Sequence, residues 1–246
     1  MSVVIRRATP HDAVAIAAIV LEAFGERINE ESGRVARVLR QSDNFVAESD
    51  DRVVGFVGNF LTRSGSGRLR FELDLLAVAQ DARGGGIGAV LVDASIEAAA
   101  SAKVDVIRTL VASRNAAMQR LCRSRGFRRD PTRHVLFVTD AQVWGGADME
   151  ATESLEGVVT GEASNTSEAY LIPVETLTYS GIWLEGGIRK SAIDEARRLA
   201  YDGGMSRIGA VLPQSDEGAV KLLATNRFDR VGEFDWWTIK TGSGRS

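Results

Sequence analysis

The chain has 246 residues, 44% hydrophobic and 26% charged, which is typical of a globular protein with one large domain or two small ones. A net charge of −3 gives no reason to expect a nucleic acid or an anionic membrane as its main partner. One cysteine and two histidines exclude an internal disulfide framework and cannot supply a typical zinc site, so we expect a cytoplasmic protein without a metal cofactor.

The first third of the chain predicts a strand, two helices and a set of antiparallel strands. Thr9 and Pro10 are placed to start a helix that ends at Gly25, and a weaker helical pattern covers residues 30–41. Strand-like segments are residues 2–7, 45–48, 53–61 and 68–78. The longest apolar run, residues 13–21, is too short to span a bilayer.

The last of these strands carries two carboxylates. Strict alternation predicts that one face holds Phe71, Leu73 and Leu75, and that the other holds Glu72, Asp74, Leu76 and Val78. The two carboxylates are therefore expected to face the same side as the end of the strand.

Helices and strands alternate in the next segment. The patterns predict helices over 86–101 and 115–125, a mostly buried strand over 104–111, and a final hairpin formed by 127–129 and 134–139. This alternation is typical of an α/β sandwich.

A glycine-rich turn joins strand 68–78 to helix 86–101. Gly84, Gly85, Gly86 and Gly88 precede an alanine-rich amphipathic run, so free backbone N–H groups and the positive end of the helix dipole would converge on an anion. Glycines also tolerate positive φ and allow close approach to the main chain. The pattern predicts a phosphate or pyrophosphate ligand.

Three kinds of phosphate loop fit such a turn. A P-loop is excluded because neither Lys-Ser nor Lys-Thr follows the last glycine. A dinucleotide fingerprint is nominally present as Gly84, Gly86 and Ala89, but Asp105 opens the following strand, whereas the fingerprint requires an acidic residue at its end. A tight turn that binds no phosphate is an alternative to all three loops, although one glycine would suffice for such a turn.

The third kind of phosphate loop has the pattern Gln/Arg-x-x-Gly-x-Gly/Ala. Residues Arg83 to Gly88 match this pattern, and Leu76-Ala77-Val78 stand upstream of it. This segment resembles the coenzyme A loop of the GNAT acetyltransferases. The run from Asn115 to Leu121-Cys122 and Gly126-Phe127 resembles the second signature of that family, in the expected order. The resemblance implies a GNAT fold, in which helices flank a mixed central β-sheet, and acetyl-CoA as co-substrate.

A GNAT-sized unit ends near residue 140, and we interpret 141–152 as a linker. Residues 153–246 align on the first unit without a gap: Gly85-Gly86-Ile87 matches Gly186-Gly187-Ile188 (186 − 85 = 101). The copy replaces Gly84 by Glu185, whose charge would repel a pyrophosphate. We therefore interpret it as a truncated, degenerate GNAT-like half that extends the sheet or covers the acceptor cleft.

The resemblance assigns roles to individual residues. It implies that Leu76, Ala77 and Val78 pair with the pantetheine arm, with the Val78 amide at the acetyl carbonyl. It implies that Asn115 orients the pantetheine. The pyrophosphate would be held by Arg83, Gly84, Gly85, Gly86, Ile87, Gly88 and Ala89.

Acetyl transfer to an amine also needs a proton acceptor and a proton donor. Glu72 is the first candidate for the base and Asp74 the second; both could equally be solvated carboxylates or bind a cationic substrate. Cys122 stands where the family has a tyrosine that serves as the acid, but helical cysteines are more often small buried residues.

Several other groups have two interpretations. Trp236 and Trp237 either line a substrate pocket or homodimer face, or are buried in the last strand. Both histidines, His11 and His134, are expected at the surface or in packing. A basic cluster either contacts the 3′-phosphate of the coenzyme or forms a solvated helix end; it comprises Arg123, Arg125, Arg128 and Arg129.

We expect an acetyl-CoA-dependent N-acetyltransferase that acts on a primary amine of a small molecule or peptide in a ternary complex. The alternative is a coenzyme A-binding sensor or scaffold with little catalysis. An intact Glu72 favours the enzyme and Cys122 favours the alternative.

Overall fold

The computed structural model describes residues 3–25, 28, 33–41, 43–141, 164–166 and 169–241. In chain order its elements are β1 (Val4–Arg7), the 3₁₀ turn η1 (Pro10–Asp12), α1 (Ala13–Phe24), α2 (Arg34–Gln41), β2 (Phe45–Ser49), β3 (Arg52–Arg63), β4 (Leu69–Val78), η3 (Gln80–Ala82), α3 (Ile87–Ser101), β5 (Val106–Ala112), α4 (Ala116–Ser124), β6 (Arg128–Arg129), β7 (His134–Asp140), β8 (Ser164–Thr166), β9 (Ala169–Glu175), β10 (Ser180–Gly186), α5 (Lys190–Asp202), β11 (Arg207–Pro213), α6 (Glu217–Thr225) and β12 (Asp229–Lys240).

The predicted helices and strands of residues 3–141 are present. Thr9 and Pro10 start the 3₁₀ turn that leads into α1, and Gly25 ends α1 with a φ of 71°. Asn115 caps α4 by accepting a hydrogen bond from the Met118 amide.

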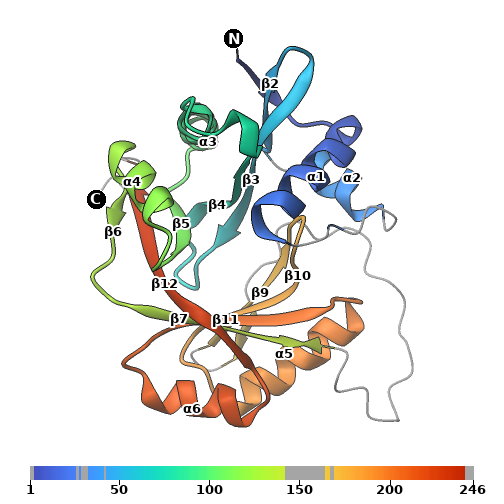
Figure 1. Ribbon diagram of the computed structural model, residues 1–246. Helices are drawn as coiled ribbons and strands as arrows, with labels where there is room; N and C mark the ends of the chain where they lie inside the picture. Colours follow the sequence, from blue (N-terminus) through green and yellow to red (C-terminus); the bar gives the residue numbers. More distant parts are fainter. Residues whose placement is uncertain are drawn as a thin grey trace.

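One 12-stranded sheet runs through both halves of the chain, in the order β1-β2-β3-β4-β5-β12-β7-β11-β10-β9-β8. The pairs β4–β5 and β10–β11 are parallel, and the other pairs are antiparallel. In Figure 1 the first half, with α1 to α4, lies above the second half, with α5 and α6.

The two halves exchange their last strands. β12 of the second half pairs with β5, while β7 of the first half pairs with β11. The expected hairpin of 127–129 with 134–139 is therefore wrong, because β6 pairs with β12 at Trp237 and Thr238. Each half completes its sheet with a strand from the other.

Because of this strand exchange, the hydrophobic core of each half contains residues from the other half. Trp237, from the last strand, is buried with Leu91 of α3 and Phe71 of β4 in the first-half core. Val135 and Phe137, from the first half, are buried with α5 and α6 in the second-half core. A third core packs α1 and α2 on the opposite face of β3, since Phe56 faces it while Val57 faces α3.

Later elements of the first half recur in the second half at the same spacing. Both bounds of β5 and α4 recur 101 residues later as the bounds of β11 and α6 (207 − 106). Upstream, the alignment without a gap is wrong. Phe71 pairs with Ile107 and Ile182 pairs with Ile208, so the segment from strand to strand is 36 residues in the first half and 26 in the second (107 − 71 and 208 − 182). The ten missing residues lie between strand and helix, where the first half has the end of β4 and η3, because α3 and α5 still end 101 residues apart (202 − 101).

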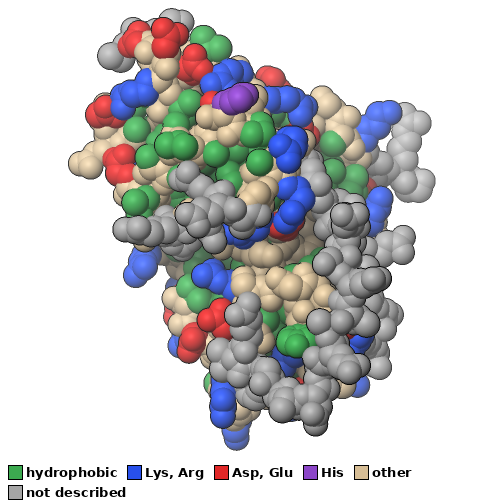
Figure 2. Space-filling model, turned by 90° about the vertical axis from the view of Figure 1, so that its right-hand side faces the viewer, with side chains coloured by type: hydrophobic (Ala, Val, Ile, Leu, Met, Phe, Trp, Pro, Cys, Tyr) green, Lys and Arg blue, Asp and Glu red, His purple; other side chains and the backbone are tan. Residues whose placement is uncertain are grey.

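The side of the molecule that carries α1 and α2 shows Lys and Arg side chains near the junction of the halves (Figure 2). Here Arg34 donates to the carbonyls of Thr176 and Leu177, and Arg37 pairs with Glu175. The turn between β9 and β10 is thereby held against α2.

Residues 142–152 of the proposed linker, most of the segment 26–32, and residues 242–246 lie outside the described residues. None of the helices that the structure describes is long and apolar enough to cross a membrane.

Candidate active site

The candidate coenzyme site is a fork between two strands. β4 and β5 pair only from Arg70 to Glu72, opposite Val106 to Arg108, although β4 continues to Val78 and β5 to Ala112. Beyond Glu72 the edge of β4 that faces β5 has no strand partner among the described residues. The predicted pantetheine-binding residues, Leu76, Ala77 and Val78, lie on this open edge.

The glycine turn follows directly. Gly84 and Gly86 have φ values of 86° and 79°, which favour glycine, and Gly86 is the residue before α3. None of the N–H groups of Gly84, Gly85 and Gly86 donates to a backbone carbonyl within the described part of the chain. These exposed residues and the start of α3 are arranged as a candidate anion site, which stays a prediction of the sequence.

The other residues predicted to bind the coenzyme have different positions in the structure. Ile87 is buried at the start of α3, and the Arg83 guanidinium donates to the Val78 carbonyl at 2.9 Å, which fixes the loop to the strand end. Gly88 and Ala89 lie in the first turn of α3. The Asn115 side-chain oxygen is engaged by its helix cap, at 3.0 Å from the Met118 nitrogen.

A β-bulge separates the two predicted functions of β4. Leu76 pairs with Val57 and Leu73 pairs with Asn59, so Asp74 and Leu75 together oppose the single residue Gly58. The extra residue reverses the alternation. Leu76 and Val78 pack with Leu73 against α3, so the expectation that they share a face with Glu72 and Asp74 is wrong.

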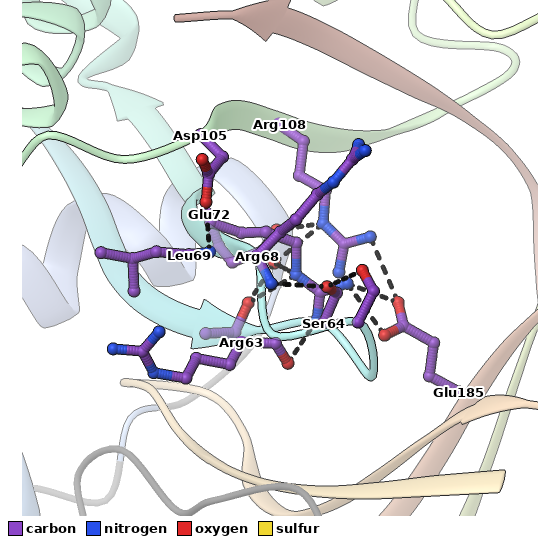
Figure 3. Close-up of polar contacts among 11 residues, drawn as sticks. Arg63, Ser64, Arg68, Leu69, Glu72, Asp105, Arg108 and Glu185 are labelled. Atoms are coloured by element: carbon purple, nitrogen blue, oxygen red, sulfur yellow. Dashed lines mark hydrogen bonds and ion pairs between the residues drawn. The ribbon is translucent and has the colours of Figure 1, made fainter. Parts of the chain in front are cut away.

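Glu72 is the centre of a buried ion network (Figure 3). Its side chain is 7% exposed; it accepts a hydrogen bond from Thr62 at 2.6 Å and from Arg108 Nε at 2.8 Å to each oxygen. Arg70 Nε lies 3.4 Å away. Both arginines also reach Glu185 of β10, at 2.7 Å and 3.3 Å.

Burial works to lower the pKa of Arg108, but its ion pairs with Glu72 and Glu185 outweigh this and hold the pKa above its ordinary value. The residue thus stays charged and keeps Glu72 occupied. Glu185, expected to repel a pyrophosphate, instead binds two arginines of the other half.

Sequence reasoning missed Arg70, Arg108 and Glu185. The available signal was Arg108 itself, a charge within a segment that otherwise predicts a buried strand. No local pattern indicates its partner Glu185, which is 77 residues away.

Asp74 differs from Glu72 in its surroundings. It is exposed at the bulge and lines a cavity of about 540 Å³ that also touches Glu72 and Arg108. Of the two candidate bases, Asp74 has the more accessible carboxylate.

Cys122 is 1% exposed in the first-half core, and burial raises the pKa of its thiol to about 12. This position favours the packing interpretation. The two adjacent tryptophans have different surroundings. Trp237 is 1% exposed in the first-half core. Trp236 lines the cavity, and the Arg108 guanidinium lies 4.1 Å from the centroid of its ring. His134 is buried, as the packing interpretation expects.

Two arginines of the predicted basic cluster form ion pairs within the protein. Arg125 pairs with Asp93, and Arg129 pairs with the buried Asp235. Arg123 lies 5.4 Å from the Trp237 ring centroid. Within the described residues no group of three or more His, Cys, Asp and Glu side chains could hold a metal ion.

Comparison with known proteins agrees with this geometry. Residues 14–127 match the model of the acetyltransferase (GNAT) family. A ribosomal-protein-alanine N-acetyltransferase from Brucella melitensis is 31% identical, over 56% of this chain and 88% of that one, with a TM-score of 0.47. No curated protein matches the chain.

Two solved structures resemble both halves. A putative acetyltransferase from Pyrococcus horikoshii has a TM-score of 0.61 at 15% identity, over 99% of this chain and 91% of that one. The GCN5-related glucosamine N-acetyltransferase region of a fungal multi-domain GH3 β-N-acetylglucosaminidase has a TM-score of 0.62 at 13% identity, over 97% of this chain and 38% of that one. Signature residues, fold and sequence identity lead to one conclusion: the chain belongs to the GNAT acetyltransferase family.

Proposed function

We propose that the protein transfers an acetyl group from acetyl-CoA to a primary amine. The observation that carries this proposal is the fork between β4 and β5, with an open strand edge that leads into the glycine turn at the start of α3. A pantetheine arm fits such an edge as an added strand, and a pyrophosphate fits the turn.

The coenzyme would supply the reactive thioester. The chain's own residues would orient it: the edge of Leu76–Val78 fixes the arm, and the Val78 amide donates to the acetyl carbonyl. Gly84 and Gly86 allow the main chain to approach the phosphates because no side chain fills the space beside them.

The amine must lose a proton before it attacks. Of the two carboxylates on β4, Asp74 suits this role because it is exposed to the cavity, whereas both oxygens of Glu72 are engaged by Arg108. Val78 is four residues beyond Asp74, about 13 Å along a strand, so the proton would pass through water.

A second candidate function is coenzyme A binding without efficient transfer. The buried position of Cys122 favours it, because this chain then lacks an accessible acid where the family has a tyrosine. The two functions make the same prediction for coenzyme binding and differ in turnover.

Coenzyme binding is tested with Gly85→Glu. Gly85 has ordinary φ, and a Cβ on it would make only an ordinary contact with the Ala82 carbonyl oxygen at 3.7 Å, so glutamate adds charge at the candidate anion site without backbone strain. We expect calorimetry to show at least tenfold weaker coenzyme A binding, because like charges repel. Gly187→Glu is the control in the second half, because Gly187 also has ordinary φ and precedes α5, and it should bind as the wild type does.

Loss of binding in the Gly187→Glu variant, or two coenzyme sites per chain, would contradict the assignment of the site to the first half. Thiol release from acetyl-CoA with a panel of amines, amino acids, aminoglycosides and peptides then separates the two functions. Tight binding with no release across the panel would favour the sensor.

A further inference from the structure

The cavity of about 540 Å³ lies between the two halves, and its volume is suited to a small molecule. The first half contributes Glu72, Asp74 and Arg108 from the fork. The second half contributes Tyr179 and Trp183 from the β9–β10 turn and β10.

The wall from the second half is aromatic and closely fitted. Tyr179 and Trp183 pack edge to face, with ring centroids 5.8 Å apart at 77°, and the Tyr179 hydroxyl donates to the Ile182 carbonyl. Gly209 leaves room for both side chains. A Cβ on Gly209 would come within 2.8 Å of the Trp183 ring and 3.0 Å of the Tyr179 hydroxyl.

The two walls are equivalent positions of the repeat. Glu72 pairs with Arg108 in the first half, and Trp183 pairs with Gly209, 101 residues after Arg108, in the second (209 − 108). Trp183 therefore stands at the position of Glu72, where the alignment without a gap would place Pro173 (72 + 101). The cavity is thus lined by charged residues of the first half and aromatic residues of the second.

The balance of charge in the cavity is negative. Arg70 and Arg108 are neutralised by Glu72 and Glu185. Among the residues that the structure describes, the other charged groups lining the cavity are three carboxylates, Asp74, Asp140 and Asp229, and one cation, Arg207. An excess of carboxylates attracts a cation into the cavity.

We propose that this cavity receives the acceptor and selects a cationic amine with an aromatic or apolar body. The ammonium group lies toward Asp74 at the fork, and the body packs on Trp183 and Tyr179. The assignment rests on the proposed function, since the fork is also where the acetyl group would be presented. The second half then contributes to the choice of acceptor.

The test uses calorimetry on the full chain without coenzyme, so it does not depend on catalysis. The probe is 2-phenylethylamine, and phenylacetate is the matched ligand of opposite charge. We expect 2-phenylethylamine to bind at least tenfold more tightly than phenylacetate. Trp183→Ala should weaken that binding at least tenfold, whereas Tyr201→Ala, an exposed aromatic on α5, should not.

Val174→Phe provides a second variant, because it fills the cavity from β9 without removing the aromatic wall. It should also abolish binding of 2-phenylethylamine. Equal binding of the two ligands, or unchanged binding in both Trp183→Ala and Val174→Phe, would overturn the proposal. A coenzyme A titration of the same protein is read separately: its failure counts against the proposed transferase, whatever the cavity binds.

Discussion

Glu72 and Asp74 are two residues apart on β4 and have different roles in the structure. Glu72 is buried among Thr62, Arg70 and Arg108, while Asp74 is exposed at the bulge. A buried carboxylate that neutralises two arginines supports structure first, and an accessible one can exchange protons with a substrate.

Substitution separates these roles. We expect Glu72→Gln to lower the free energy of unfolding by about 3–5 kcal/mol, since it leaves Arg70 and Arg108 with only Glu185 as a counter-ion. Asp74→Asn should leave stability within about 0.5 kcal/mol. It should reduce turnover about 10²- to 10⁴-fold, with partial recovery at high pH, where more of the amine is neutral.

Urea unfolding and thiol release measure the two effects. Wild-type turnover in Asp74→Asn would exclude Asp74 as the base. If Glu72→Gln alone lost turnover while its stability was unchanged, the base would be Glu72.

At the scale of elements, short irregularities place the functional groups. The bulge in β4 sends Leu76 and Val78 to the α3 core and leaves Glu72 and Asp74 facing the cavity. At the other end of the half, the turn η1 joins β1 to α1 through Asp12, which accepts hydrogen bonds from Thr9 and Arg6.

This junction predicts a pH dependence. The Arg6 guanidinium lowers the pKa of Asp12 from 3.8 to about 2. A lowered pKa stabilises the folded state above the unfolded value, and that contribution is lost as the pH falls through the folded value. Asp12→Asn should therefore cost roughly 2 kcal/mol at pH 7, and the difference from the wild type should shrink between pH 4 and pH 2.

Chemical unfolding of both proteins at pH 7, 5 and 3 checks this expectation. A difference in the free energy of unfolding that stays constant from pH 7 to pH 3 would show that packing, rather than the ion pair, carries the effect of Asp12.

At the scale of the whole molecule, the exchange of β7 and β12 makes each half depend on the other. Trp237 lies in the first-half core and Phe137 in the second-half core, although each belongs to the other half by sequence. The Arg70–Glu72–Arg108–Glu185 network and the contacts of α2 with the β9–β10 turn cross the same junction.

The exchange predicts reciprocal effects of two core substitutions. Trp237→Ala should cost about 3–5 kcal/mol, because it empties a large site in the first-half core. Hydrogen exchange should quicken mainly in β5 and α4. Phe137→Ala is the matched variant and should quicken exchange in β11 and α6; if each substitution affected only its own half of the sequence, the strand exchange would be contradicted.

Much of the candidate coenzyme site was predictable from the sequence, because its parts are local. The turn from Arg83 to Gly88, the cap at Asn115 and the repeat of the later helices and strands depend on residues close together in the chain. Glycines, caps and hydrophobic periodicity have short-range physical causes, so the family resemblance follows from contiguous segments.

The acceptor side was decided only by the tertiary structure. One extra residue opposite Gly58 reversed the faces of β4, and the partner of Arg108 comes from residue 185. A one-residue shift in register moves every later side chain to the other face of the sheet, and no local pattern records it. Strand pairing across the two halves, which brings Trp183 and Glu72 into the lining of one cavity, likewise depends on contacts between distant segments.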